Sequence, residues 1–381
     1  MSEQEIVRAA PHVDVHLGVN WLRGREEINF QGGFTSWFIG KKKSGKSNGG
    51  EAVAVKCMNA GASTTFDTCA SGDGENFAWL KKESPYRDNV LIVHGSGMKV
   101  TAPCHTKPIA EFNLRECEKY WVVITNPALY RSRKDYYTGL AYMMDEHFMK
   151  RTVWNNSIVH LIREARKILM SRFMAHKATN IAMAQEQFIE MHNESEHTAI
   201  ANVIDALRPN SIVPDVRELA NYTFIKTFGA MRIPRDMYNI LKKVNPTWIR
   251  RMETNRFVLY TDSDNVGVGS VDLIPWHHKR GTPILRDVGV TIETQEDRPP
   301  GEDAATLRQE MLPSASEENA RDKKMEANAE LHKWMEERHA EGKTYLEIFD
   351  LAVQEGKMQA TESWYKVKYH LNGHCVCKID R

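Results

Sequence analysis

The chain has 381 residues, with 51 Lys and Arg against 50 Asp and Glu, so its formal net charge is +1. Hydrophobic residues make up 41% and charged residues 27% of the chain. This composition excludes a mainly disordered or fibrous protein, and the length predicts one large domain with a smaller one, or two medium ones. The neutral total argues against a nucleic-acid-binding protein only if the charges are evenly spread.

Neither a membrane span nor an export signal is visible in the sequence. No apolar run approaches the roughly 20 residues that a membrane helix needs, and the opening residues MSEQEIVRAAPHVDVH show no signal-peptide core. The six cysteines form no CxxC pair and no zinc-ligand spacing, which predicts reduced thiols. We therefore expect a cytoplasmic protein without membrane insertion.

The first fifth of the chain predicts a strand, a helix and a loop, in that order. Residues 1–33 are a lead-in with scattered apolar residues. The β-prone run 34–39 (FTSWFI) ends at a glycine and predicts a buried strand. Residues 47–58 predict a helix, and residues 59–76, rich in Gly, Ser, Thr and Asp, predict a loop.

Further along the chain, apolar β-prone runs alternate with helical patterns. The predicted strands are 89–94, 120–125, 157–162, 198–206, 222–228 and 256–261. The predicted helices are 134–150, 164–174, 179–194 and 235–252. Strands that alternate with helices of this length predict βα units, and hence an α/β fold with a mainly parallel sheet buried on both faces.

The composition changes at about residue 295. Residues 295–330 contain ten acidic and five basic side chains but few large apolar ones, which predicts an acidic linker. It would join a core of residues 1–294 to a C-terminal module of residues 331–381. In that module apolar residues return in short helical units, and Thr344 and Thr361 stand where N-caps are expected.

Residues 40–47 (GKKKSGKS) satisfy the P-loop pattern G-x-x-x-x-G-K-[ST] between a predicted strand and a predicted helix. Backbone N–H groups of such a loop wrap around phosphate oxygens. Lys46 would reach the β- and γ-phosphates of ATP, and Ser47 would bind Mg²⁺. The predicted nucleotide-binding residues are Gly40, Lys43, Ser44, Gly45, Lys46, Ser47 and Asn48.

A P-loop enzyme also needs an acidic residue after a second buried strand, to hold Mg²⁺ or to activate water. Residues 157–164 (SIVHLIRE) form an apolar run that ends in Arg163 and Glu164, with Arg where Asp would be usual. Residues 142–146 (YMMDE) contain the usual Asp-Glu but lie within a helical pattern. We favour Glu164 as the catalytic and metal-binding carboxylate, and we interpret the second stretch as a solvated helix face.

The order of GKKKSGKS, LIREARKILMSR and IANVIDALRPNSIVPDVRELANYTFIKTFG resembles the FtsK/HerA class of P-loop DNA-translocating ATPases, especially its divergent archaeal, viral and phage members. The resemblance covers roughly residues 34–262. It implies a RecA-like core and a hexameric ring that hydrolyses ATP to move double-stranded DNA. It also implies a partner such as a portal, capsid or membrane-complex protein, and a viral member would act in the host cytoplasm or the virion.

Two departures from the pattern of that class affect the predicted site. Arg163 replaces the usual Walker B Asp, which leaves open how Mg²⁺ is held. Leu207 replaces the usual sensor Gln, which leaves open whether Arg208 or Asp205 senses the γ-phosphate.

An arginine that reaches a neighbouring subunit's nucleotide is also expected if the protein forms a ring. Arg208 and Arg217 are the predicted catalytic arginines, and Arg232 and Arg235 are further candidates for such a finger. Surface salt bridges explain Arg208 and Arg217 equally well.

Two stretches have residue types suited to DNA. Residues 241–286 hold eight Lys and Arg against four acids, which suits either a phosphate-contacting surface or a solvated basic face. The last forty residues resemble a helix-turn-helix unit, whose second predicted helix carries Lys366, Lys368 and His370 as predicted DNA-binding residues. A three-helix protein-interaction module explains that pattern equally well.

Two other functions stay open on the sequence. The chain could be a P-loop ATPase of a protein secretion or pilus-type machine. It could also be a DNA-binding adaptor that uses nucleotide as a switch without turnover, since two positions depart from the translocase pattern.

Overall fold

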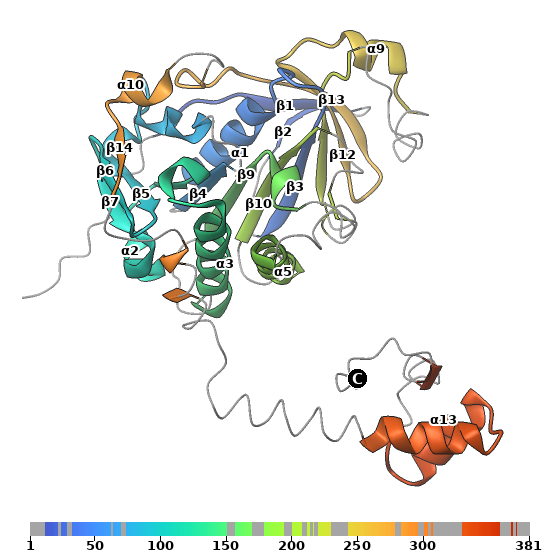
Figure 1. Cartoon of the computed structure of the whole chain (residues 1–381). Coiled ribbons are helices and arrows are strands. Elements are labelled where there is room, and N and C mark those ends of the chain that lie inside the picture. Colours follow the sequence, from blue (N-terminus) through green and yellow to red (C-terminus); the bar gives the residue numbers. More distant parts are fainter. Residues whose placement is uncertain are drawn as a thin grey trace, which may run out of the picture. The chain divides into compact units, whose positions relative to one another are not determined.

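Figure 1 shows the chain as a computed structural model. The structure describes residues 12–21, 24–28, 33–61, 64–69, 74–150, 157–169, 179–193, 200–207, 212–213, 216, 220–229, 243–278, 283–295, 301–303, 306–307, 330–358, 367–368 and 371. The chain divides into two compact units, residues 1–310 and residues 311–381. The division, after residue 310, lies within the segment 295–330 that the sequence predicts as a linker.

The first unit is an α/β fold around one large sheet, as the sequence predicts. Its strands are β1 (Leu17–Trp21), β2 (Gly24–Glu27), β3 (Phe34–Ile39), β4 (Thr64–Cys69), β5 (Val90–His94), β7 (His105–Pro108), β8 (Val122–Thr125), β9 (Ile158–Arg163), β10 (Ile200–Ala206), β11 (Tyr222–Ile225), β12 (Arg256–Thr261) and β13 (Val266–Val271). A separate two-stranded sheet pairs β6 (Met98–Thr101) with β14 (Thr291–Thr294).

Helices follow or connect these strands. The α-helices of the first unit are α1 (Lys46–Ala60), α2 (Leu114–Cys117), α3 (Arg133–Lys150), α5 (Thr179–Asn193), α9 (Pro246–Arg251) and α10 (Ile284–Val288). Short 3₁₀ helices are η1 (Glu75–Leu80), η2 (Arg87–Asn89), η3 (Ile109–Glu111), η4 (Pro127–Leu129) and η6 (Ala165–Lys167).

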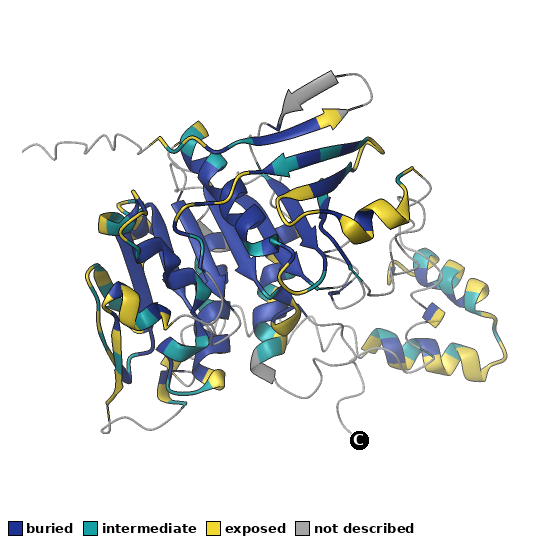
Figure 2. Cartoon of the chain, turned by 90° about the horizontal axis from the view of Figure 1, so that it is seen from above, coloured by how far each residue is buried: buried dark blue, intermediate teal, exposed yellow. Residues whose placement is uncertain are grey.

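The strand order of the large sheet is β2-β1-β13-β12-β11-β3-β10-β9-β4-β8-β5-β7. From β11 to β7 all neighbours are parallel, whereas the pairs from β11 to β2 are antiparallel. The P-loop strand β3 lies between β10 and β11, and the central strands are buried along their length (Figure 2). Because parallel strands end at the same edge, the carboxyl ends of β3, β4, β9, β10 and β11 lie along that edge.

Helices cover both faces of the parallel part of the sheet. On one face, α1 packs over β3, β9 and β10, where Gly50 lies against Leu161. The next residue back along β9, His160, points to the opposite face because side chains alternate along a strand. Its Nε2 lies 2.9 Å from Nδ1 of His147 on α3, and α3 packs against α5. The central parallel strands β3, β4, β9 and β10 are therefore buried on both faces.

Most predicted elements are confirmed within the described residues, and most of the errors are strands that the sequence did not predict. The predicted loop 59–76 is wrong, because it contains the fully buried strand β4. The threonines of β4 made the segment look like a polar loop. In the core, the Thr64 hydroxyl donates to the Tyr120 carbonyl at 2.9 Å, which satisfies this polar group. The lead-in 1–33 contains β1 and β2, and β6, β7 and β13 were likewise not predicted.

Two predicted helices are only partly covered by the described residues. Within 164–174 the structure has the 3₁₀ helix η6 rather than an α-helix, and residues 170–174 lie outside the described part. Within 235–252 it has α9, and residues 235–242 lie outside.

The second unit contains a helical stretch at residues 330–340 and the helix α13 (Tyr345–Gln354). Thr344 is the N-cap of α13, as predicted, and forms a capping box with Glu347. Apolar side chains from both helices, together with two residues that follow them, form a small core: Met335, Ile348, Ala352, Met358 and Val367. Thr361 lies outside the described residues.

Candidate nucleotide site

The P-loop joins the carboxyl end of β3 to the first turn of α1, as the sequence predicts. Its backbone turns at Lys43 (φ 60°) and Gly45 (φ 80°), both in the left-handed region. A side chain on Gly45 would bring its Cβ within 2.5 Å of the Thr254 carbonyl oxygen, so only glycine fits there. The loop therefore presents backbone N–H groups at the positive end of α1, a geometry suited to phosphate.

The two P-loop residues expected to contact phosphate and metal lie at the start of α1. The Lys46 ammonium donates to the Lys41 carbonyl of the same loop at 3.0 Å. The Ser47 hydroxyl lies 3.0 Å from Oδ2 of Asp205 and 3.2 Å from Oε2 of Glu75. One hydroxyl donates only one proton, so two carboxylates converge on a group that can satisfy one of them.

These contacts bring together residues far apart in the sequence. Asp205 lies near the end of β10 and is buried, and its Oδ1 accepts the backbone N–H of Glu164 at 2.6 Å. Glu75 begins η1, which follows β4 after residues outside the described part. The hydroxyl and the two carboxylates come from α1, β10 and η1, all at the carboxyl edge of the sheet.

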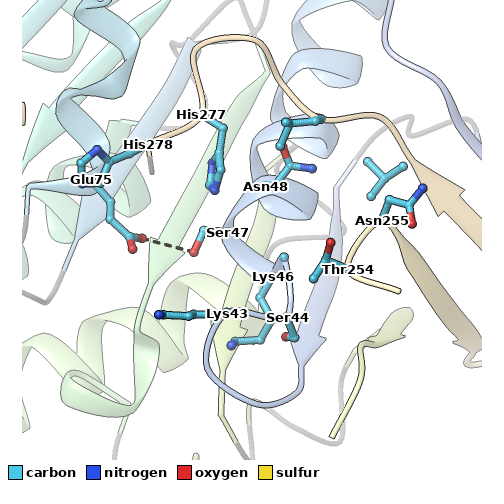
Figure 3. Close-up of a pocket in the computed structure, with 13 residues that line it drawn as sticks. Lys43, Ser44, Lys46, Ser47, Asn48, Glu75, Thr254, Asn255, His277 and His278 are labelled. Atoms are coloured by element: carbon cyan, nitrogen blue, oxygen red, sulfur yellow. Dashed lines mark hydrogen bonds between the residues drawn. The ribbon is translucent and has the colours of Figure 1, made fainter. Parts of the chain in front are cut away.

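A pocket of about 470 Å³ opens beside the P-loop (Figure 3). Its lining consists of residues 43–48 of the P-loop and α1, together with Glu75, Thr254, Asn255, Val271, Leu273, His277 and His278. In Figure 3 the Glu75 carboxylate points toward the Ser47 hydroxyl. The phosphate loop, the Ser47 hydroxyl and a carboxylate thus face one cavity.

Magnesium suits this set of donors. In the described residues no group of three or more His, Cys, Asp and Glu could hold a metal by itself. Ser47, Asp205 and Glu75 supply a hydroxyl and carboxylate oxygens, and Mg²⁺ prefers hard oxygen ligands completed by water and nucleotide phosphates. The residues present therefore fit a magnesium ion that arrives with a nucleotide.

Arg163, at the end of β9, occupies the place where an acidic residue was expected and is fully buried. Its guanidinium contacts both carboxylate oxygens of Asp67, with Nε at 2.9 and 3.0 Å, and its Nη2 lies 2.8 Å from Oε1 of Glu51. Trp79 Nε1 also donates to Asp67 at 2.7 Å. The positive charge at this position is therefore neutralised by buried acids from α1 and β4.

His277 connects this buried network to the pocket. Its Nδ1 lies 2.6 Å from Oε2 of Glu51, and the ring also lines the cavity. Burial alone would raise the pKa of Glu51, but His277 and Arg163 outweigh it and lower that pKa to about 2. Glu51 is therefore a structural anion, bound to Arg163 and His277 of the protein itself.

The structure locates Glu164 beside, and not in, the pocket lining. Glu164 follows β9 with φ 50°, and its carboxylate lies 3.3 Å from Nζ of Lys167. Its backbone, rather than its side chain, reaches Asp205. The predicted catalytic role of Glu164 therefore stays a prediction.

Asn48, a predicted nucleotide-binding residue, lines the pocket. Its side-chain amide also binds the backbone of Asp272 and Ile274, at 3.0 and 2.8 Å.

Several predicted site residues lie outside the described part of the chain: Arg208, Arg217, Arg232, Arg235, Lys366 and His370. Lys368 is among the described residues. It is helical and exposed, and it follows the buried Val367. The predicted helix with Asp145 and Glu146 is confirmed, since both residues lie on α3.

Sequence reasoning missed Glu75, His277 and the partners of Arg163. Glu75 lies in a stretch read as loop, and no local pattern separates it from a solvated acid. The one available signal was the unusual Arg163, because a buried arginine requires acidic partners elsewhere in the fold.

Comparisons with known proteins give structural similarity alone. No model of a known protein family matches the sequence, and no curated protein matches it. Among solved structures, the DNA-packaging ATPase B204 of Sulfolobus Turreted Icosahedral Virus aligns at 14% identity and a TM-score of 0.35, over 63% of this chain and 98% of that chain.

Two further similar structures come from other machines. The conjugation coupling protein TcpA of pCW3 aligns at 14% identity and a TM-score of 0.38, over 71% of this chain and 67% of that one. EccC of Thermomonospora curvata (ATPases 2 and 3) aligns at 8% identity and a TM-score of 0.42, over 72% of this chain and 46% of that one.

Among the described helices of this chain, none combines the length and the apolar character needed to cross a bilayer.

Proposed function

We propose that this chain is an ATPase that binds ATP with Mg²⁺ at the P-loop and hydrolyses it. The observation that carries the proposal is the convergence of Asp205 and Glu75 on the Ser47 hydroxyl, next to a phosphate-binding loop whose pocket Ser47 and Glu75 line. A loop that bound phosphate for structural reasons alone would not need two carboxylates at the metal-binding serine.

Each residue of the site has a separate role in this proposal. The loop N–H groups and Lys46 bind the phosphates, and Lys46 exchanges its contact with the Lys41 carbonyl for phosphate oxygen. Ser47 and Asp205 would hold the magnesium ion, which when bound neutralises charge that develops on the phosphates. Glu75, which lines the pocket, orients the attacking water. Glu164, which directly follows β9, is the alternative residue for orienting the water.

Nucleotide binding is tested with Lys46→Ala. This variant should lose binding of a fluorescent ATP analogue, while the exposed Lys99→Ala on β6 retains it. Binding retained in Lys46→Ala would show that the P-loop is not the nucleotide site.

Hydrolysis separates the two glutamates. Single-turnover assays should show that Glu75→Gln binds ATP but loses hydrolysis by about 100-fold or more, with a smaller loss in Glu164→Gln. The reverse order would assign water orientation to Glu164. If the wild type has no turnover with or without DNA, the nucleotide-switched adaptor becomes the better reading.

We further propose that hydrolysis moves double-stranded DNA and that the chain works as a ring. This step rests on the resemblance of residues 34–262 to FtsK/HerA translocases and on the basic residues of the second unit, of which Lys368 is exposed. Duplex DNA should stimulate turnover at low salt, where phosphate contacts are strongest. No stimulation would favour a motor that acts on protein. Negative-stain images with ATP and DNA should show a ring with a central channel.

A further inference from the structure

Lys226 is a buried lysine beside the P-loop that the proposed reaction does not use. It follows β11 directly, and its backbone N–H donates to the Ile39 carbonyl at the end of β3, at 2.7 Å. The side chain extends along the loop: a Cβ on Gly40 would lie 2.9 Å from Lys226 Cβ, and a Cβ on Gly45 would lie 3.6 Å from Lys226 Cε. The lysine therefore spans from the first P-loop glycine to the second.

The amine of Lys226 is buried at the far end of that path. The side chain has no exposed area, and among the described residues its Nζ finds no hydrogen-bond partner. The ring of Phe257 lies near it, with 5.9 Å from Nζ to the ring centroid. A buried amine without an acceptor destabilises a folded protein, and an apolar side chain of similar length would fill the same space without that cost. Packing alone therefore does not explain a lysine here.

We propose that Lys226 is a second cation of the phosphate site, which lies beneath the P-loop and stabilises the negative charge of a bound nucleoside triphosphate. The proposal rests on the proposed function, because it requires that the P-loop binds nucleotide. Lys46 would approach the phosphates from the start of α1, and Lys226 would act from the β11 side of the loop. Lys226 is a positioning and electrostatic residue in this account.

The surroundings of Lys226 predict that nucleotide binding takes up a proton. Burial first, and then the like charge of Lys46, lower the pKa of Lys226 to about 7. Among the described residues, the other groups shown to lie near its side chain are uncharged: the Phe257 ring and the two P-loop glycines. Phosphate charge would raise this pKa, since an opposite charge favours the ammonium. A group with a higher pKa in the bound state makes binding weaker as pH rises through 7.

Calorimetry of Lys226→Met and Lys42→Met tests the proposal. Methionine keeps the unbranched length and removes the charge, and Lys42 is an exposed lysine of the same loop outside the pocket lining. A non-hydrolysable ATP analogue with Mg²⁺ is titrated at pH 8 in two buffers with different ionisation enthalpies. Wild type and Lys42→Met should take up about one proton more than Lys226→Met. Lys226→Met should bind about 10- to 100-fold more weakly.

Thermal unfolding separates this role from a structural one. Without nucleotide, Lys226→Met should melt at the wild-type temperature or above it, because the variant loses a buried amine. Wild-type affinity and proton uptake in Lys226→Met would overturn the inference, as would a lower melting temperature with unchanged nucleotide binding. If Lys226→Met does not fold, the wild type alone decides the test. The inference is then overturned if the wild type takes up no more protons on binding than the nucleotide itself accounts for. Wild type that binds no nucleotide at all overturns the proposed function first.

Discussion

Two clusters of acids lie at the same edge of the sheet, and they differ in what balances their charge. In the first, which we call the arginine network, Glu51 and Asp67 surround Arg163, and His277 contacts Glu51. In the second, which we call the serine cluster, Asp205 and Glu75 converge on the Ser47 hydroxyl. The network carries its own cation, Arg163, whereas the shared group of the serine cluster is neutral.

This difference explains how a P-loop protein can have arginine where the metal-binding acid is expected. With Arg163 at the end of β9, a metal there would meet a positive charge, and the nearby acids are already engaged. The strand on the P-loop side of β9 is β10, which provides Asp205 next to Ser47. If Asp205 holds Mg²⁺ as proposed, the metal-binding acid lies one strand nearer to the P-loop than Arg163, which belongs to the buried core.

The largest expected effect comes from breaking the network. Asp67→Asn removes the carboxylate that accepts hydrogen bonds from the buried Arg163 and from Trp79, in a site without solvent, and should lower the free energy of unfolding by about 3–5 kcal/mol. The measurement is urea denaturation against the exposed Asp287→Asn as control. Nucleotide binding by the fraction that remains folded should keep its Mg²⁺ dependence. A change in that dependence without loss of stability would mean that Asp67 belongs to the metal site.

Asp205→Asn should have the opposite profile. It removes a carboxylate from the serine cluster, so turnover should fall by about 100-fold or more and the Mg²⁺ concentration for half-maximal rate should rise. The melting temperature should stay within a few degrees of wild type or rise, because two carboxylates on one hydroxyl repel each other. Asp287→Asn again serves as the control in steady-state assays at several Mg²⁺ concentrations. Equal turnover in Asp205→Asn and wild type would remove Asp205 from the site.

The sequence predicts one part of this comparison and not the other. GKKKSGKS and the apolar runs of β3, β9 and β10 predict the phosphate loop and the parallel sheet, because burial on both faces leaves a continuous apolar signal. β4 was missed since its polar threonines are buried in the core, where the Thr64 and Thr68 hydroxyls donate to backbone carbonyls, a fact that no local pattern contains. Polar strands of this kind are read as loops.

The partners in the two clusters depend on contacts across the whole unit. Asp205 is 158 residues from Ser47 in the chain, and Asp67 is 96 residues from Arg163. Arg163 itself was recognised as unusual, but its neutralisation by Glu51 requires the position of α1 over β9. The residue type is visible in the sequence, whereas the charge balance is a property of the folded sheet edge.

Acid should weaken the network through Glu51. The pKa of Glu51 is lowered to about 2 in the folded protein from the model-compound value of 4.5, so the unfolded chain binds its proton first as pH falls. The stabilisation is full above pH 4.5 and is lost toward pH 2. Between pH 5 and pH 3 the wild type should lose about 2 kcal/mol more stability than Glu51→Gln does. Exposed Glu83→Gln should follow the wild-type pH profile in denaturant titrations; a Glu51→Gln profile parallel to wild type would contradict the assignment.

His277→Asn should have the smallest effect and tests whether the two clusters are separate. The imidazole binds Glu51 at 2.6 Å but also lines the pocket, so it is the group through which one cluster could influence the other. If its main role is in the network, the variant should lose about 1 kcal/mol of stability, since Arg163 still pairs with Glu51. Turnover should fall by less than about tenfold, with unchanged Mg²⁺ dependence, and exposed His105→Asn is the control. A large loss of turnover with unchanged stability would instead mean that the arginine network and the serine cluster form one catalytic unit, with His277 facing the nucleotide.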